Sequence, residues 1–344
     1  MSQKTYYYVH GHTASGKQDF SQSNIKNIKN VFVLTHPSLK VKTAVIRKFV
    51  NFYEGQLNLE IIKSVHGNDY LDGLIVRNKS VALFTESTPE FEDMLNVNLG
   101  NFFDIKNTDY EVLDKEKLAI ENAYNDFSAG LKIHDDLEEI YISQMDFARA
   151  DELTKEFIEK LLYSQPISET KGHTYHRLFG TNTSDGVVNV VPEIIQGVNN
   201  VYFIKGRAGT GKSTFMKKIA NACTEHGLDI ELYHCSFDPN SIDMVLVRDL
   251  DFCIFDSTDP HEFFPKKDGD RIIDLYEELV TPGTDEKYAD KISELNNRYK
   301  SYMKKGIENL KKAGQYRDQI EEKYALPGEN EFNKVVENII NQIS

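Results

Sequence analysis

The sequence predicts an α/β protein of two tandem parallel-sheet domains, each followed by charged helices. Three observations predict this fold: the length, an internal repeat, and the alternation of short apolar runs with amphipathic helical segments. A chain of 344 residues is long enough for about two domains. Short apolar strands that alternate with helices are typical of a parallel sheet covered on both faces.

The internal repeat appears as matched stretches in the two halves of the chain. Residues 30–34 (NVFVL) match residues 200–204 (NVYFI). After a one-residue slip, residues 57–64 (LNLEIIKS) match residues 228–235 (LDIELYHC). Most aligned positions keep their apolar or polar character, which indicates a diverged duplication.

The repeat divides the chain near Ser164–Thr170. We therefore expect a first domain of residues 1–168 and a second domain of residues 169–344. The elements expected in the first half are, in order, a strand, a helix and two strands, at 31–34, 43–52, 59–62 and 81–84. Their counterparts in the second half are expected at 201–204, 213–225, 230–233 and 252–255.

Each half then ends in a charged helical stretch, at residues 115–162 and 285–324. Glu and Lys recur there at helical spacings, which predicts a solvated face over a modest apolar stripe.

Composition is that of an ordinary globular protein. The 40 basic and 54 acidic residues give a formal net charge of −14. Proteins that bind nucleic acid by neutralising phosphates usually carry a basic face, so this balance argues against a nucleic-acid partner. No apolar run approaches the roughly 18 residues of a membrane span, and residues 1–12 lack a signal-peptide core. We expect a cytoplasmic protein whose Cys223, Cys235 and Cys253 are buried thiols.

The strongest motif lies between the strand at 201–204 and the helix that follows it. It fits G-x-x-x-x-G-K-[ST] at every fixed position. Its residues, with the one after it, are Gly206, Arg207, Ala208, Gly209, Thr210, Gly211, Lys212, Ser213 and Thr214. Glycines at these places let successive backbone N–H groups turn inward and form an anion site at the positive end of a helix. We therefore expect both domains to be P-loop NTPase-like, with ATP bound in the second.

Two side chains of the second half are expected to act on the bound nucleotide. Lys212 would reach the β- and γ-phosphates, and the Ser213 hydroxyl would bind Mg²⁺. The metal also needs a carboxylate at the end of a neighbouring apolar strand, and Asp256 ends the run DFCIFD. Lys212 and Asp256 are the predicted catalytic residues, and Ser213 and Asp256 the predicted metal ligands.

The residue after Asp256 bears on the identity of the catalytic base. Many hydrolysing P-loop enzymes place a Glu directly after this Asp, but here Ser257 follows. This departure does not favour fast, motor-like hydrolysis. Asp238, Asp259 and His261 remain candidates for a base or a substrate contact, and each also fits a simple loop or capping role.

The first half has lost this chemistry. Residues 36–43 (HPSLKVKT) stand opposite the glycine motif and keep Lys42 and Thr43. The three glycines are replaced by His36, Leu39 and Val41. Left-handed backbone costs a non-glycine residue roughly 1–2 kcal/mol, and the added side chains would fill the phosphate cradle. Since Thr85 also replaces Asp256, we expect no turnover in the first half.

A second glycine motif and two histidine pairs are expected not to form sites. Residues 11–17 (GHTASGK) fit part of the same pattern, but Gln18 follows where a hydroxyl would bind Mg²⁺. This stretch also aligns with residues upstream of the motif in the second half. The pairs His10/His12 and His173/His176 have no further Cys or His nearby for a metal.

The whole chain resembles a bacterial family of tandem P-loop ATPases, sometimes labelled nucleotide-kinase-related. The resemblance rests on FIKGRAGTGKSTFMKKIA from Phe203, YHCSFDPNSID from Tyr233, FDSTDPH from Phe255 and HDDLEEIYISQMDF from His134. It implies that residues 206–214 hold the nucleotide and that Asp256 holds the metal. The first half departs from the family pattern by losing its glycines, which puts cooperativity between two nucleotide sites in doubt.

Three functions remain open. The favoured one is a Mg-dependent ATP hydrolase that acts as a nucleotide-dependent switch between the two halves. The alternatives are a kinase for a small molecule or nucleotide, and a nucleotide-binding interaction protein with negligible turnover. The acceptor or protein partner is not specified. Arg47 and Arg77 are candidates for an arginine that the first half contributes to the γ-phosphate, although each also fits a solvated or paired surface role.

Overall fold

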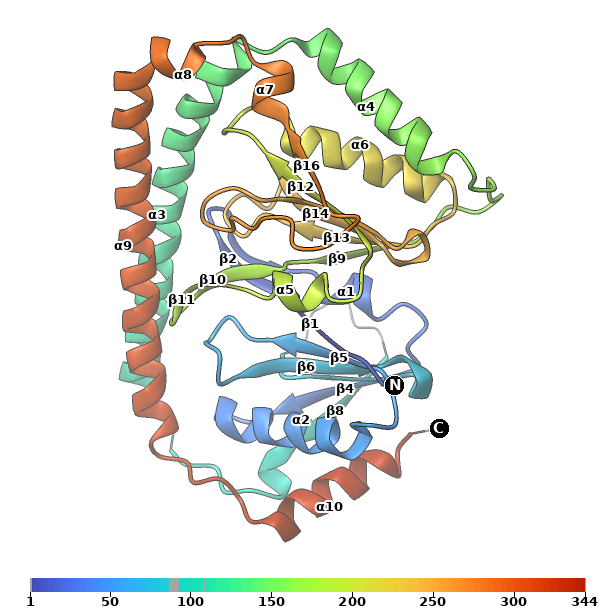
Figure 1. The fold of residues 1–344 in the computed structure, drawn as a ribbon. Helices are drawn as coiled ribbons and strands as arrows, with labels where there is room; N and C mark the ends of the chain where they lie inside the picture. The colour runs from blue at the N-terminus through green and yellow to red at the C-terminus, as the bar shows by residue number, and fades with distance from the viewer. Residues whose placement is uncertain (1, 87–92, 108, 344) are drawn as a thin grey trace.

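A computed structural model describes residues 2–86, 93–107 and 109–343 and shows an α/β chain built from two repeated domains (Figure 1). The first half contains, in order, β1 (Lys4–Tyr8), β2 (His10–Thr13), β3 (Gly16–Asp19), α1 (Ser21–Asn24), β4 (Asn30–Thr35), α2 (Leu39–Tyr53), β5 (Leu59–Lys63), β6 (Leu71–Val76), β7 (Val81–Phe84) and β8 (Met94–Asn98). The second half contains β9 (Thr174–Arg177), β10 (Gly180–Thr183), β11 (Gly186–Asn189), α5 (Val191–Ile194), β12 (Asn200–Lys205), α6 (Lys212–Glu225), β13 (Ile230–His234), β14 (Ile242–Val247), β15 (Phe252–Asp256) and β16 (Arg271–Asp274).

Six helices follow these sheets in the described parts of the chain. They are α3 (Tyr110–Ile142), α4 (Phe147–Leu162), α7 (Leu275–Leu279), α8 (Thr284–Lys287), α9 (Ala289–Glu321) and α10 (Glu329–Ile340). The strands and helices expected from the repeat are confirmed, although several run a few residues longer. The sequence reading omitted α10.

The two sheets have the same strand order, which confirms the repeat. The first runs β1-β5-β6-β7-β4-β8, and the second runs β9-β13-β14-β15-β12-β16. The expectation of wholly parallel sheets was wrong, because β6 and β14 are antiparallel to both of their neighbours. The physical reason is the short connection before each of them. Residues 235–241 contain no helix between β13 and β14, whereas a parallel crossover needs a dozen residues or more.

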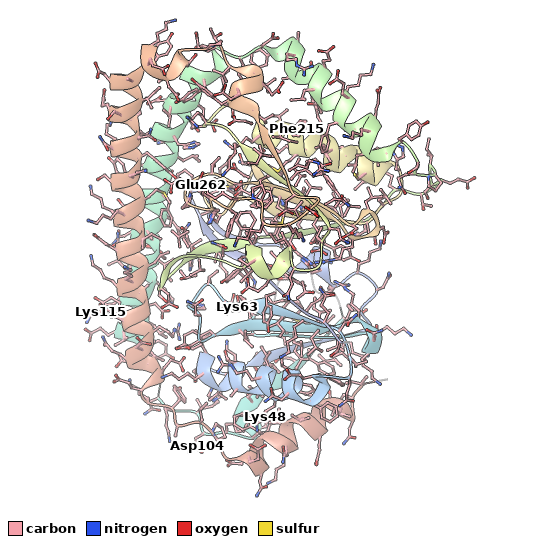
Figure 2. The ribbon with its side chains drawn as sticks, viewed as in Figure 1. Lys48, Lys63, Asp104, Lys115, Phe215 and Glu262 are labelled. Carbon is pink, nitrogen blue, oxygen red and sulfur yellow. The ribbon has the colours of Figure 1, made fainter. Side chains whose placement is uncertain are left out.

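The last helix of each half packs on the domain formed by the other half. Phe157 of α4 lies 5.4 Å, ring to ring, from Phe215 of α6, which Figure 2 labels beneath α4. Phe332 of α10 is buried in the first half's core beside α2, and Glu329 pairs with Lys48 there. Each half therefore completes the core of its partner.

Helices α3 and α9 form a long antiparallel pair along one side of both domains (Figure 1). Arg317 forms two hydrogen bonds to the buried Glu116, of 2.7 and 3.0 Å, and Asn309 donates to Asp126. Because the pair is antiparallel, α3 ends beside the second domain and α9 ends beside the first. The expected charged stretch at 115–162 covers most of α3 and all of α4, and the stretch at 285–324 contains α9.

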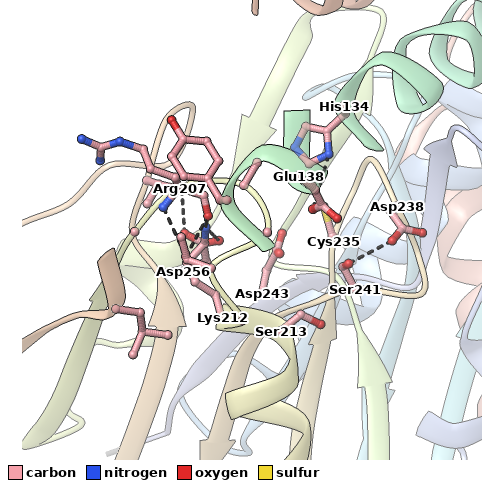
Figure 3. Close-up of a pocket in the computed structure, with 18 of the residues that line it drawn as sticks. His134, Glu138, Arg207, Lys212, Ser213, Cys235, Asp238, Ser241, Asp243 and Asp256 are labelled. Carbon is pink, nitrogen blue, oxygen red and sulfur yellow. Dashed lines mark hydrogen bonds and ion pairs between the residues drawn. The ribbon is translucent and has the colours of Figure 1, made fainter. Parts of the chain in front are cut away.

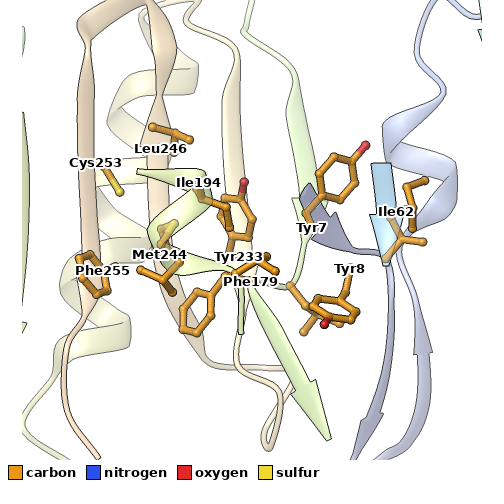
Figure 4. Close-up of a cluster of buried hydrophobic side chains, with 14 of the residues drawn as sticks. Tyr7, Tyr8, Ile62, Phe179, Ile194, Tyr233, Met244, Leu246, Cys253 and Phe255 are labelled. Atoms are coloured by element: carbon orange, nitrogen blue, oxygen red, sulfur yellow. The ribbon is translucent and has the colours of Figure 1, made fainter. Parts of the chain in front are cut away.

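A shared core joins the two sheets. Figure 4 shows Tyr7, Tyr8 and Ile62 of the first half facing Phe179 and Tyr233 of the second. The buried Arg177 guanidinium donates to Glu60 and to Glu231, each at 2.8 Å, and so pairs with one carboxylate from each half.

The partial glycine motif at residues 11–17 forms the turn of the hairpin β2–β3, and no helix follows it directly. Among the described residues, no helix has the length and apolar character needed to cross a membrane.

Candidate functional site

Residues 206–213, which we call the glycine loop, connect β12 to α6. Gly206, Gly209 and Gly211 have φ angles of +155°, +72° and +81°, a region that side chains rarely adopt. A Cβ at Gly206 would lie 2.6 Å from the Thr210 hydroxyl oxygen, so space as well as backbone conformation requires glycine there. Thr210 is fully buried and donates to the Arg207 carbonyl at 2.8 Å, which fixes the turn.

The predicted Lys212, Ser213 and Asp256 come together at one end of the sheet (Figure 3). In parallel register, Asp256 of β15 lies beside Ile204 of β12, two residues before the loop begins. The Lys212 ammonium donates to the Arg207 carbonyl at 2.6 Å and lies 3.6 Å from an Asp256 carboxylate oxygen. Ser213 is the second residue of α6, and its hydroxyl oxygen accepts from the Ile242 N–H at 2.9 Å.

A further carboxylate, which sequence analysis missed, lies in the same place. In the antiparallel register of β14 and β15, Met244 pairs with Phe255. The next residues, Asp243 near the start of β14 and Asp256 at the end of β15, therefore lie side by side. Burial and the Asp256 carboxylate raise the pKa of Asp243 to about 7. The signal was present in the repeat, where Asp72 matches Asp243, but the strand that carries it was not recognised.

These groups line a cleft of about 1130 Å³. The glycine loop forms one wall, and α3 and α9 contribute the facing wall, with residues that include His134, Glu138, Tyr141, Tyr299 and Lys300. The first half thus contributes side chains to a cleft in the second half. His134, Asp135 and Glu138 have ligand atoms within 4.8 Å of one another, and the structure contains no ion.

Arg207 lines the cleft, and its side chain is half-exposed. Its guanidinium donates to Asp285 at 3.0 Å and lies over the Tyr276 ring, 4.9 Å from the centroid. Tyr141 of α3 donates to the same carboxylate at 2.8 Å. This set of contacts connects the glycine loop to α3 and to the segment before α9.

The three candidate bases all line the cleft, but each has structural partners. Asp238 caps the turn at residues 238–241, and Asp259 is exposed and pairs with Lys300 at 3.2 Å. His261 is buried against the Phe179 ring. Ser257 is fully buried and exchanges two hydrogen bonds with the backbone of Phe263.

The equivalent segment of the first half, residues 36–43, is here called the counterpart loop. It contains no left-handed residue, and α2 begins already at Leu39, capped by the Ser38 side chain. The Glu321 carboxylate, from the end of α9, accepts from Leu39 N–H at 2.7 Å, from Lys40 N–H at 3.2 Å and from the Ser38 hydroxyl. Lys42 is buried and donates to the Thr85 carbonyl at 3.1 Å.

Arg47 and Arg77, the candidate arginines of the first half, are not among the residues that line the cleft. Arg47 donates to the Asp69 carbonyl, and Arg77 pairs with Glu60 near the interface between the halves. The histidine pairs also have other partners. His10 contacts Asp72 at 2.8 Å, His12 contacts Tyr124, and His176 contacts His234.

The residues that α3 and α9 bring to the two loops were also not predicted. A signal existed, since residues 135–141 (DDLEEIY) match residues 318–324 (DQIEEKY). This second repeated motif places Glu138 opposite Glu321 and Tyr141 opposite Tyr324. The motif shows that the two helix ends contact the two loops only once the antiparallel pairing of the helices is known. Spacing along the chain does not reveal that pairing.

No family model, curated protein or solved structure matches the chain. The resemblance to tandem P-loop ATPases therefore stays a prediction.

Proposed function

We propose that the protein binds Mg·ATP at the glycine loop of its second half and hydrolyses it as a nucleotide-dependent switch. One observation carries this proposal. Three glycines in left-handed or extended positive-φ conformations form a loop between a buried strand and the first turn of α6, with Lys212 and Asp256 beside it. Such a loop directs backbone N–H groups toward an anion at the positive end of a helix.

The residues present fit a magnesium ion with a nucleotide. Ser213 and Asp256 both line the cleft and supply the hydroxyl and carboxylate oxygens that this cation prefers. Bound Mg²⁺ would neutralise charge on the phosphate oxygens. Lys212 adds a fixed positive charge at the start of α6.

A switch role is supported by the source of the cleft's walls. His134, Glu138 and Tyr141 are borne by α3, which begins beside the first domain, while the glycine loop belongs to the second. A change at the loop would therefore act directly on a helix that spans both domains. The first half would therefore take part in the cycle of ATP binding and hydrolysis, although its own loop is closed.

Phosphoryl transfer to a small molecule or a nucleotide is the second candidate. The hydroxyl of Ser257, at the position where a water-orienting Glu is common, exchanges hydrogen bonds with the Phe263 backbone and accepts from Lys205. The cleft also extends from the glycine loop to Asn296, Tyr299 and Lys300 of α9, which leaves polar surface for an acceptor. A protein that binds nucleotide with negligible turnover is the third candidate.

Release of the γ-phosphate from Mg·ATP distinguishes these functions. We expect release by the purified chain without an added acceptor, with loss of release in Lys212→Ala. Release that depends on an added metabolite pool would favour a kinase. Binding of ATP without release under either condition would favour the interaction protein and contradict the hydrolase.

A further inference from the structure

The counterpart loop already holds an anion that belongs to the chain. Glu321 is fully buried, and its carboxylate accepts from two backbone N–H groups at the first turn of α2 and from Ser38. A carboxylate at this place satisfies N–H groups that have no partner within the helix and is favoured by the helix dipole. Glu321 therefore stands where a phosphate would bind in a working loop.

Glu138 holds the equivalent place at the glycine loop. A Cβ at Gly209 would lie 2.5 Å from the Glu138 carbonyl oxygen, so the end of α3 packs directly on the loop. The Lys212 ammonium and the Gly209 backbone both favour the charged form of the Glu138 carboxylate, which partly offsets the rise in its pKa that burial causes. Figure 3 shows Glu138 on α3, facing the cleft together with His134.

The two contacts differ in how tightly the carboxylate is held. Glu321 is buried and has three donors, whereas the Glu138 side chain is 36% exposed, with a distance of 3.6 Å to His134. Burial and the neighbouring Asp135 raise the pKa of Glu138, so its charge is poorly compensated where it lies. The carboxylate on the glycine loop is thus the one that an incoming anion can replace.

We propose that Glu138 competes with nucleotide phosphate for the glycine loop, so that phosphate binds only when the end of α3 moves off the loop. This inference rests on the proposed nucleotide site. Glu321 occupies the equivalent position at the counterpart loop, where it is not displaced, and so keeps that loop closed. Because α3 packs along α9, displacement of Glu138 couples phosphate binding to the helix pair that connects the two domains.

The test measures the dissociation constants of Mg·ATP and of inorganic pyrophosphate by calorimetry on the full chain. Glu138→Gln keeps the size of the side chain and removes its charge, and we expect both ligands to bind roughly tenfold tighter. That factor corresponds to a competitor that occupies the loop in about nine molecules of ten. Glu321→Gln is the matched control at the same helix position, and its affinities should stay within about twofold of the wild type.

A second measurement follows backbone hydrogen exchange in residues 131–142 before and after ATP is added. We expect ATP to speed exchange there in the wild type and to have little effect in Glu138→Gln. Unchanged or weaker binding by Glu138→Gln, while the wild type binds, would overturn the competition alone. Absence of binding in every variant would overturn the proposed nucleotide site as well.

Discussion

At the scale of single residues, the two loops show how the backbone changes when each of the three glycines is replaced by another residue. Gly206, Gly209 and Gly211 keep the glycine loop open ahead of α6. At the matched positions His36, Leu39 and Val41 the chain instead turns into helix early, and α2 begins at Leu39. The sequence predicted the loss of the glycine conformations, but it placed the start of the helix at residue 43, four residues late.

Residues that act across the fold could not be predicted in the same way. Asp243 reaches the site because β14 is antiparallel to β15, and Glu138 reaches it because α3 extends past its own domain. Neither fact is a local property of the chain. Lys212, Ser213 and Asp256 could be predicted because each lies within two residues of a recognisable strand end or helix start.

The buried His12 gives a prediction at this scale about acid stability. Burial lowers the pKa of His12 to about 3, from an ordinary value near 6.5, and its ring shares a 2.8 Å hydrogen bond with Tyr124. Below pH 6.5 the unfolded chain takes up a proton that the folded chain does not. Stability should therefore be complete above pH 6.5 and fall as the pH is lowered toward 3, by up to about 1.4 kcal/mol per pH unit from this residue.

Urea unfolding of the wild type and of His12→Gln between pH 7 and pH 5 measures this effect. The free energy of unfolding should fall more steeply with decreasing pH in the wild type, because Gln takes up no proton. Parallel pH dependence in the two proteins would show that His12 is not held neutral by burial.

At the scale of elements, periodicity predicted the strands β4, β5 and β7, the helix α2, and their counterparts in the second half. The strands β6 and β14 were missed, although each is largely buried and follows the strand before it without an intervening helix. Helix α10 was missed although it buries Phe332, Val335 and Ile339 against the first domain. Its apolar residues Phe332, Val335 and Ile339 recur at helical spacing, so the local pattern could have predicted the helix. The distant core that the helix covers could not be predicted in this way.

The elements around the cleft also predict which base the nucleotide carries. No Asn/Thr-Lys-x-Asp motif for guanine occurs in the sequence, and Lys266-Lys267-Asp268 lacks the leading residue. In the structure Lys267 donates to the Val198 carbonyl and does not line the cleft. We expect ATP to bind more tightly than GTP in a competition assay with a fluorescent ATP analogue. Equal dissociation constants would contradict this reading.

At the scale of the whole molecule, the two halves depend on one another. Helix α4 of the first half covers α6, and α10 of the second half covers α2. Arg177 pairs with a carboxylate from each half within the shared core. A buried cation that loses one of its partners is costly, by about 3–5 kcal/mol.

Separate expression of residues 1–168 and 169–344 tests this dependence. Each fragment would expose the apolar surface that its partner's helix covers, so we expect neither to show a cooperative thermal transition alone. Co-expression should restore one complex with a single transition, as judged by size-exclusion chromatography and circular dichroism. A fragment 169–344 that folds alone and turns over ATP at the full-length rate would show that α3 and α4 are dispensable.

The central claim is that one half binds nucleotide and the other is closed by its own carboxylate. The stoichiometry of Mg·ATP binding, measured by calorimetry on the full chain, tests this claim most directly. We predict one site per chain, lost in Lys212→Ala and retained in Lys42→Ala with an unchanged dissociation constant. Two sites per chain, or comparable losses from both substitutions, would contradict the account.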